Sequence, residues 1–161
     1  MDGAPGGPST SSQVTLRRCR YRDLPQVVAI EKESFTDPYS LFEFAAHLMS
    51  SRSKLVVACA NQVVVGYVLA IHESRRIGQI QSIAVSRELR GRGIGTMLMS
   101  SAMEHLTKLD KVRLVVRRTN MEAIRLYRSF SFRESGRVVE GYYPNGEDAI
   151  EFEWISPKNR E

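Results

Sequence analysis

The stretch IQSIAVSRELRGRGIGTMLMSSAMEHL, residues 80–106, contains a strand pattern, a glycine-rich turn and a helical pattern in direct succession. Three glycines, Gly91, Gly93 and Gly95, stand at the point where the helical pattern begins. Each costs the folded backbone roughly 0.5–1 kcal/mol relative to alanine, so the turn needs a compensating function. The first backbone N–H groups of a helix lack intrahelical acceptors and carry partial positive charge. The turn therefore predicts a binding site for a phosphate-bearing ligand.

Positive charge is concentrated around this turn. The 161-residue chain has 23 Lys and Arg residues against 18 Asp and Glu residues, a formal net charge of +5. Residues 87–137 contain 12 of those basic residues and only 5 of the acidic ones. This distribution favours an anionic ligand and also leaves a nucleic-acid surface open as an alternative.

Strand and helix patterns on both sides of the turn indicate a mixed α/β domain. Strand patterns at 79–85 and 112–116 enclose the helix and predict a parallel, right-handed strand–helix–strand unit. Runs 54–60 and 63–71, separated by Asn-Gln, predict a hairpin. Capping boxes are expected at Ser40 with Glu43 and at Thr119 with Glu122. We expect a Gly/Pro/Ser tail at 1–12, one domain at 13–156 and a short C-terminal tail at 157–161.

Composition excludes several classes of protein. No apolar run approaches the roughly 18 residues that a membrane-spanning helix requires, and MDGAPGGPSTSS lacks the features of a secretory signal. Cys19, Cys59 and the three histidines show no metal-ligand spacing, so we expect buried thiols and no metal site. A cytoplasmic location follows as the expectation.

Two common phosphate-binding motifs do not fit the turn. The Walker motif needs Gly-Lys-Ser/Thr, whereas Thr96 follows Gly95 directly, and the same threonine breaks the dinucleotide pattern G-x-G-x-x-G. The pattern that fits is Arg-x-x-Gly-x-Gly, with Arg90, Gly93 and Gly95. Together with the preceding SIAV strand, it resembles the acetyl-CoA motif of the GNAT superfamily of N-acetyltransferases.

Two further motifs extend the resemblance over residues 14–154. TNMEAIRLYRSFSF, residues 119–132, resembles the family's Asn-x-x-Ala-x-x-Leu-Tyr-x-x-x-Gly-Phe, with Ser131 in place of the glycine. GYYPNGEDAI, residues 141–150, resembles the terminal loop of protein N-terminal acetyltransferases, both RimI-like enzymes and cotranslational catalytic subunits. The resemblance implies the GNAT fold, an α/β class with a mixed central sheet of about six or seven strands flanked by about four helices.

The resemblance also implies roles for particular residues. Acetyl-CoA is expected to bind to Ile83, Ala84, Val85, Arg90, Gly91, Arg92, Gly93, Ile94, Gly95, Thr96, Asn120 and Tyr127. The phenol of Tyr127 is expected to protonate the leaving thiolate. Helical spacing alone gives a different interpretation, a core tyrosine that shares a face with Ala123 and Phe130.

The catalytic base is where this sequence departs from its relatives. RimI-like enzymes commonly carry glutamate five residues before the conserved asparagine, and here that residue is Val115. We take Glu73, at the end of a strand, as the substitute, with a solvated strand-end carboxylate as the alternative. Neutralising an α-amine of pKa near 8 at pH 7 costs about 1.4 kcal/mol, against roughly 4.6 for lysine. A site without the usual carboxylate therefore suits α-amines better.

Two loops are expected to bind the substrate, with Phe35, Asp37 and Tyr39 in one and Tyr142 and Tyr143 in the other. Packing of these side chains on the sheet is the alternative. The whole sequence predicts N-terminal α-acetylation of nascent or ribosomal proteins, with a lysine or small-amine acetyltransferase and a catalytically silent ribosome- or RNA-binding module as rivals. Expected partners are peptide N-termini and the ribosome or an auxiliary subunit. Neither DNA nor a membrane is expected, and the chain is expected to be a monomer or weak dimer.

Overall fold

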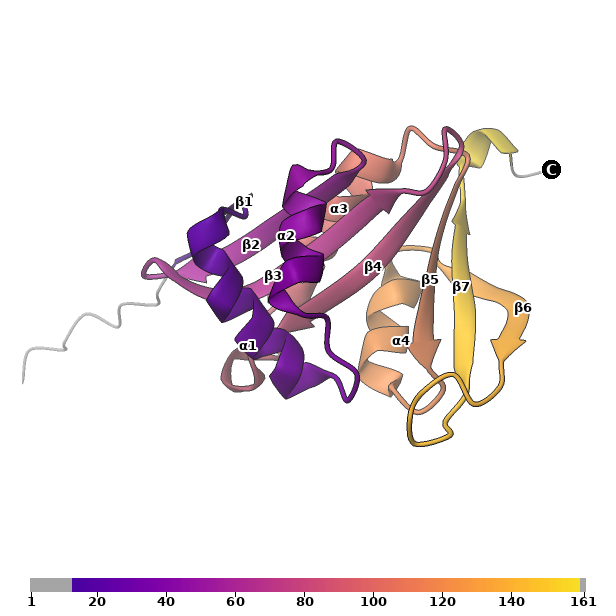
Figure 1. Cartoon of the computed structure of the whole chain (residues 1–161). Helices are drawn as coiled ribbons and strands as arrows, with labels where there is room; N and C mark the ends of the chain where they lie inside the picture. The colour runs from indigo at the N-terminus through magenta and orange to yellow at the C-terminus, as the bar shows by residue number, and fades with distance from the viewer. Residues whose placement is uncertain (1–12, 160–161) are drawn as a thin grey trace, which may run out of the picture.

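The computed structural model describes residues 13–159, which form a seven-stranded sheet in the order β1-β2-β3-β4-β5-β7-β6 (Figure 1). All neighbouring strands are antiparallel except β4 and β5, which are parallel. The strands are β1 (Val14–Arg18), β2 (Ser53–Ala60), β3 (Val63–His72), β4 (Ile77–Val85), β5 (Lys111–Arg117), β6 (Arg133–Val139) and β7 (Ala149–Ile155). The predicted mixed α/β class and the parallel strand–helix–strand unit are confirmed.

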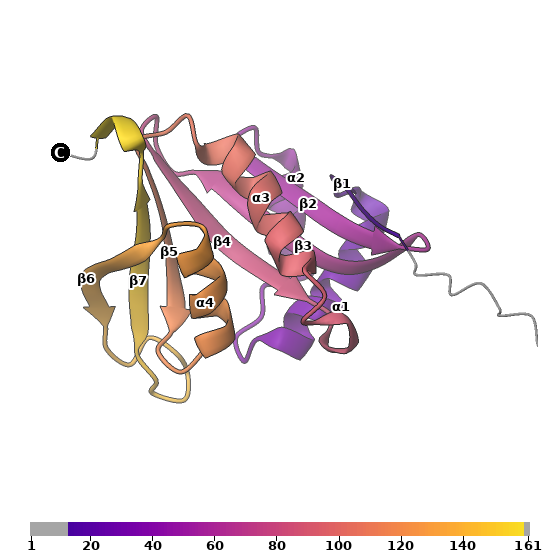
Figure 2. The same ribbon diagram turned by 180° about the vertical axis from the view of Figure 1, so that it is seen from behind.

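Helices cover both faces of the sheet. α1 (Leu24–Ser34) and α2 (Leu41–Met49) lie on one face, and α3 (Ile94–Leu106) and α4 (Met121–Ser129) lie on the other (Figures 1 and 2). The apolar core is divided accordingly, one part between α1, α2 and the sheet and the larger part beneath α3 and α4. Burial of these two apolar layers is the main favourable term that holds the helices on the sheet.

The parallel strands β4 and β5 stay together over a short distance only. Their pairing covers the residues from Ile77 opposite Lys111 to Gln79 opposite Arg113. Beyond this point the two strands diverge, as Figure 1 shows, and α4 lies behind the widening gap. β4 also has a bulge against β3, where Gln81 has no opposite residue. The edge of β4 that faces β5 is thereby left without a neighbouring strand from Ile80 onward.

Local sequence signals set most element boundaries. Ser40 and Glu43 form the predicted capping box of α2, and Asn61 and Gln62 turn the β2–β3 hairpin with φ values of +50° and +66°. The Thr119–Glu122 box is wrong, because Asn120 is the N-cap of α4 and its side-chain oxygen accepts from the Ala123 N–H.

The remaining predictions concern the ends of the chain and its cysteines. The predicted tail at 1–12 lies outside the described residues, and Pro157–Asn159 form a short 3-10 turn. Cys19 and Cys59 are both buried, as expected. Within residues 13–159 no helix is both long enough and apolar enough to cross a membrane.

Candidate active site

A cavity of about 700 Å³ lies where β4 and β5 diverge, a volume typical of small-molecule sites. The N-terminus of α3 contributes to its wall, and so do the separated parts of β4 and β5, helix α4 and two loops. The loops are the α1–α2 loop (residues 35–40) and the β6–β7 loop (residues 140–148). Lining residues of the sequence prediction are Phe35, Asp37, Tyr39, Ile83, Ala84, Val85, Arg90, Gly91, Gly93, Ile94, Gly95, Thr96, Asn120, Tyr127, Tyr142 and Tyr143.

The start of α3 has the geometry of an anion-binding site. Gly93 is the N-cap in the left-handed conformation, with φ +81°, and its carbonyl accepts the first intrahelical bond, from Met97 N–H, at 3.1 Å. The N–H groups of residues 94–96 therefore have no intrahelical acceptor, and all three residues line the cavity. A Cβ at Gly93 would meet no atom within 4 Å, so the backbone conformation, and not crowding, calls for glycine.

Arg90 is held beside these N–H groups. Its guanidinium donates to the Val85 carbonyl at 3.0 Å and to the Ser34 hydroxyl at 3.1 Å. Arg92, which was also assigned to the cofactor, is exposed and does not line the cavity. Only Arg90 of the predicted arginine pair is therefore positioned for direct contact with an anion in the cavity.

The exposed edge of β4 offers a second binding element. Ile83–Val85 line the cavity, and the side of β4 that faces β5 has no ladder partner there. Unpaired backbone N–H and C=O groups suit a ligand that carries amides, as the pantetheine arm of coenzyme A does. The N-terminus of α3 and this edge of β4 together fit acetyl-CoA. The phosphates would bind at the start of α3, and the amide-bearing arm would lie along β4.

Tyr127 on α4 contributes a buried phenol to the cavity. The residue is 7% exposed, and burial first, then the neighbouring Tyr143, raises its pKa well above the ordinary value. The phenol therefore keeps its proton at any working pH, which a proton donor requires. Tyr127 also packs against Phe132 in the core, with ring centroids 6.3 Å apart, so the core interpretation and a role in the cavity are compatible.

Asn120, the N-cap of α4, also lines the cavity. Its side-chain oxygen is used in capping α4, at 3.1 Å from the Ala123 nitrogen. The side-chain NH₂ group remains as the donor that a ligand in the cavity would meet.

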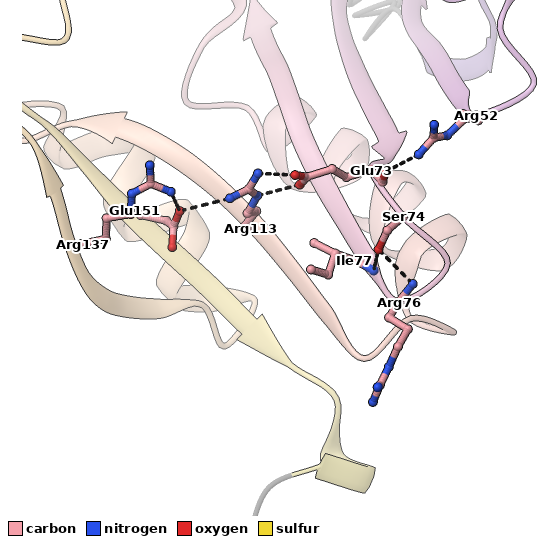
Figure 3. Close-up of polar contacts among 8 residues, drawn as sticks. All are labelled: Arg52, Glu73, Ser74, Arg76, Ile77, Arg113, Arg137 and Glu151. Carbon is pink, nitrogen blue, oxygen red and sulfur yellow. Dashed lines mark hydrogen bonds and ion pairs between the residues drawn. The ribbon is translucent and has the colours of Figure 1, made fainter.

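Glu73, the predicted base, does not line the cavity. Its carboxylate accepts two hydrogen bonds from the Arg113 guanidinium, with Nε to Oε2 at 2.6 Å (Figure 3). Arg113 also faces Glu151, which pairs with Arg137, so the four side chains form a row across the sheet. The row lies at the paired end of β4 and β5, because Arg113 is opposite Gln79, whereas the cavity begins beyond that pair.

The two predicted substrate loops both reach the cavity. In the α1–α2 loop, the Tyr39 hydroxyl accepts a hydrogen bond from the Gln81 amide at the β4 bulge. In the β6–β7 loop, the rings of Tyr142 and Tyr143 meet edge to face, with centroids 5.0 Å apart. Burial raises the pKa of Tyr39 and of Tyr143, so both phenols stay protonated and can donate hydrogen bonds.

Sequence reasoning missed Glu31, a buried carboxylate in the cavity wall. Glu31 is 1% exposed and accepts from Tyr39 N–H at 3.0 Å, from Ser82 Oγ at 3.1 Å and from the Tyr67 hydroxyl. It thus fixes one end of the α1–α2 loop to the sheet. Glu31 follows the buried Val27 by one turn of α1, which puts its carboxylate on the apolar face of the helix. This spacing was the sequence signal that could have identified Glu31.

Sequence reasoning also missed Arg117, at the end of β5. Its guanidinium donates to the Thr36 hydroxyl at 2.6 Å and to Glu147 at 2.9 Å. It also lies 3.8 Å from the centroid of the Tyr143 ring. No local pattern distinguishes Arg117 from the neighbouring arginine, Arg118.

Comparison with known proteins agrees with this geometry. The family model described as "Acetyltransferase (GNAT) family" matches residues 24–132. The N-alpha-acetyltransferase of Saccharolobus solfataricus is 32% identical over 149 residues, which cover 84% of this chain and 89% of that protein. Among solved structures, Ard1 from Thermoplasma volcanium superposes with a TM-score of 0.83 at 26% identity, covering 89% of this chain and 97% of that one.

A bacterial structure is almost as similar. The ribosomal-protein-S18-alanine N-acetyltransferase from Escherichia coli has a TM-score of 0.80 at 27% identity, covering 92% of this chain and 99% of that one. The matched family model spans the N-terminus of α3, the diverging strands and Tyr127, which form most of the cavity wall, and ends before the β6–β7 loop. The chain belongs to the GNAT family of acetyltransferases, which use acetyl-CoA.

Proposed function

We propose that this protein transfers the acetyl group of acetyl-CoA to the α-amine at the N-terminus of a protein or peptide. The observation that carries the proposal is that one cavity joins three parts. These are the anion-binding mouth of α3, the buried phenol of Tyr127 and a slot between two tyrosine-bearing loops. Relatives named for N-alpha-acetylation and for alanine N-acetylation of ribosomal protein S18 support the same choice of substrate.

Acetyl-CoA supplies an acetyl group activated as a thioester. The chain positions it with Arg90 and the N–H groups of residues 94–96 at the pyrophosphate, and with the unpaired edge of β4 along the arm. Tyr127 donates its proton to the sulfur as the C–S bond breaks, and it is reprotonated through water by the proton that the acylated nitrogen loses. Burial raises the pKa of Tyr127, so the phenol carries its proton at neutral pH until that step. The tyrosines of the two loops hold the peptide beside the thioester.

The amine must lose a proton before it attacks. With Glu73 paired to Arg113 and Val115 in the cavity wall, we assign no dedicated base next to the amine. Deprotonating an α-amine with a pKa near 8 costs only about 1.4 kcal/mol at pH 7. Its proton leaves through water at the open cavity mouth. Lysine, at roughly 4.6 kcal/mol, is disfavoured by the same site.

The proposed substrates are nascent or ribosomal proteins in the cytoplasm. The proposed partner is the ribosome or an auxiliary subunit, and the proposed oligomeric state is a monomer or weak dimer.

A catalytically silent RNA-binding module is the weaker alternative. Within residues 87–137, seven basic side chains already form ion pairs with carboxylates. These are Arg87, Lys111, Arg113, Arg117, Arg118, Arg128 and Arg137. Charges neutralised within the protein contribute less to phosphate binding than free ones do.

Two matched peptides test the proposal. One has a free α-amine and an acetylated lysine, and the other has a blocked α-amine and a free lysine. We expect mass spectrometry to find acetyl transfer to the first peptide only, with release of free coenzyme A. Transfer to the second peptide alone would instead indicate a lysine acetyltransferase, and acetyl-CoA binding without transfer to either would indicate a silent module.

A further inference from the structure

We propose that Arg117 is a positioning residue that ties the two substrate loops together and so sets the width of the peptide slot. This inference rests on the proposed function. Arg117 is the last residue of β5 and is held in register opposite Ala149 of β7. Its side chain is 19% exposed and lines the cavity, so the guanidinium extends from a rigid strand into the space between the loops.

The guanidinium uses different nitrogens for the two loops. Nη2 donates to the Thr36 hydroxyl of the α1–α2 loop at 2.6 Å. Nη1 donates to the β6–β7 loop, to Asn145 Oδ1 at 3.2 Å and to Glu147 Oε2 at 2.9 Å. Among the described residues, the hydrogen-bonded link between the two loops therefore passes through this one side chain. Loops that are far apart in sequence are held at a separation fixed by the planar group.

The β6–β7 loop is organised around the acceptor of this link. Glu147 accepts from both Arg117 and the Thr119 hydroxyl, and these two bonds lower its pKa, so it stays ionised. Backbone bonds from Tyr143 N–H to the Glu147 carbonyl, at 3.1 Å, and from Gly146 N–H to the Tyr143 carbonyl, at 2.8 Å, then close the turn. The position of Tyr143 thus follows from the position of Glu147.

Arg117 also contacts a slot-lining ring directly. The guanidinium carbon lies 3.8 Å from the centroid of the Tyr143 ring, within the range of a cation–π contact. The opposite wall, Tyr39, is held separately by Glu31 and Gln81. Loss of Arg117 therefore frees the Tyr143 wall while leaving the anchors of Tyr39 in place. Arg117 makes no hydrogen bond or ion pair with residues 90–96, the proposed pyrophosphate site.

Kinetics on peptides with different first residues provide one test. We expect Arg117→Gln to raise the peptide KM roughly tenfold and to weaken discrimination between first residues, with kcat and the acetyl-CoA KM within about threefold. Arg117→Lys keeps the positive charge but cannot donate to both loops through two separate nitrogens, so it should resemble Arg117→Gln. The matched control is Arg113→Gln, on the same strand, which loses ion pairs of its own yet contacts neither loop.

A double-mutant cycle separates the link from a general loss of stability. Thr36→Val removes only the contact of Arg117 Nη2 and should raise the peptide KM about threefold in the wild-type background but leave the Arg117→Gln enzyme unchanged. Equal effects of Thr36→Val in both backgrounds would overturn the proposal. Thr15→Val, at an exposed position of β1, is the control for the substitution itself.

Hydrogen exchange gives a readout that does not depend on activity. With the full chain, Thr36→Val should speed exchange of the β6–β7 loop amides, including Tyr143 and Gly146, roughly threefold, although Thr36 belongs to the other loop. Arg113→Gln should not. If this response occurs while no peptide is acetylated, the link stands and the proposed function fails. If the loop does not respond in an active enzyme, the link is refuted and the proposed function stands.

Discussion

Replacing Tyr127 with phenylalanine removes the proposed proton donor and little else. The hydroxyl makes no hydrogen bond with another described residue, and phenylalanine keeps the ring packed against Phe132. Unfolding free energy should therefore change by less than about 1 kcal/mol. General acid catalysis contributes roughly 10²–10⁴-fold to a rate. A thiolate with a pKa near 8.5 leaves comparatively easily, so we expect the low end, about 10²-fold in kcat or about 2.7 kcal/mol.

The assay follows release of free thiol from acetyl-CoA with saturating peptide at pH 7.5. Acetyl-CoA affinity, measured by calorimetry, should stay within about threefold, because the phosphate and β4 contacts are untouched. Tyr21→Phe is the matched control, since Tyr21 is 61% exposed and does not line the cavity. A Tyr127→Phe enzyme that keeps kcat within threefold of the wild type would refute the assignment of Tyr127 as the acid.

Four further outcomes are expected. The peptide kcat/KM should rise with pH to a plateau near the amine pKa of about 8, without a falling limb from Tyr127, because a raised pKa keeps the donor protonated until far above that pH; a falling limb below pH 10 that Tyr127→Phe abolishes would contradict this. Glu73→Gln should leave both rate and pH profile unchanged, and a shifted profile would return Glu73 to the mechanism. Ser131→Gly should raise the unfolding free energy in urea by roughly 0.5–1 kcal/mol, because serine at φ +66° is strained by more than glycine costs in chain entropy, and an unchanged midpoint would argue against strain. Asp23→Asn should lower the free energy of unfolding by about 2 kcal/mol at pH 7 through loss of the half-buried pair with Arg17. Since this pair lowers the pKa of Asp23, its stabilisation exists above the unfolded pKa near 4 and is lost as pH falls through the lower folded value, so the two proteins should converge in acid.

Elements that depend on neighbouring residues could be predicted from the sequence. The glycine turn at 91–95 and the strand–helix–strand unit around it are local, and the structure has them where the patterns indicated. Ser131 shows why the related motif has glycine there, because its φ of +66° lies in the left-handed region. The local sequence could not decide which residue is the N-cap of α4, because Thr119 and Asn120 are both good N-cap residues. The outcome depends on Glu147, which engages the threonine hydroxyl from 28 residues away.

The parts of the site that could not be predicted from the sequence are placed by contacts between strands and loops that are far apart in the chain. Glu73 was a reasonable base on its position at a strand end, but Arg113, 40 residues on, binds its carboxylate at the closed end of the diverging strands. Arg117 contacts partners 81 and 30 residues away, so nothing in its neighbourhood in the sequence reveals that it joins two loops. Such side chains become visible only when the sheet order is known.

A crystal structure with a bisubstrate compound, coenzyme A joined through an acetyl bridge to the α-nitrogen of a short peptide, tests the central claim most directly. We expect the pyrophosphate on the N–H groups of residues 94–96, the sulfur within hydrogen-bond reach of the Tyr127 hydroxyl, and the peptide leaving between Tyr39 and Tyr143. A pyrophosphate bound away from the start of α3, or a sulfur beyond the reach of that hydroxyl, would contradict the account.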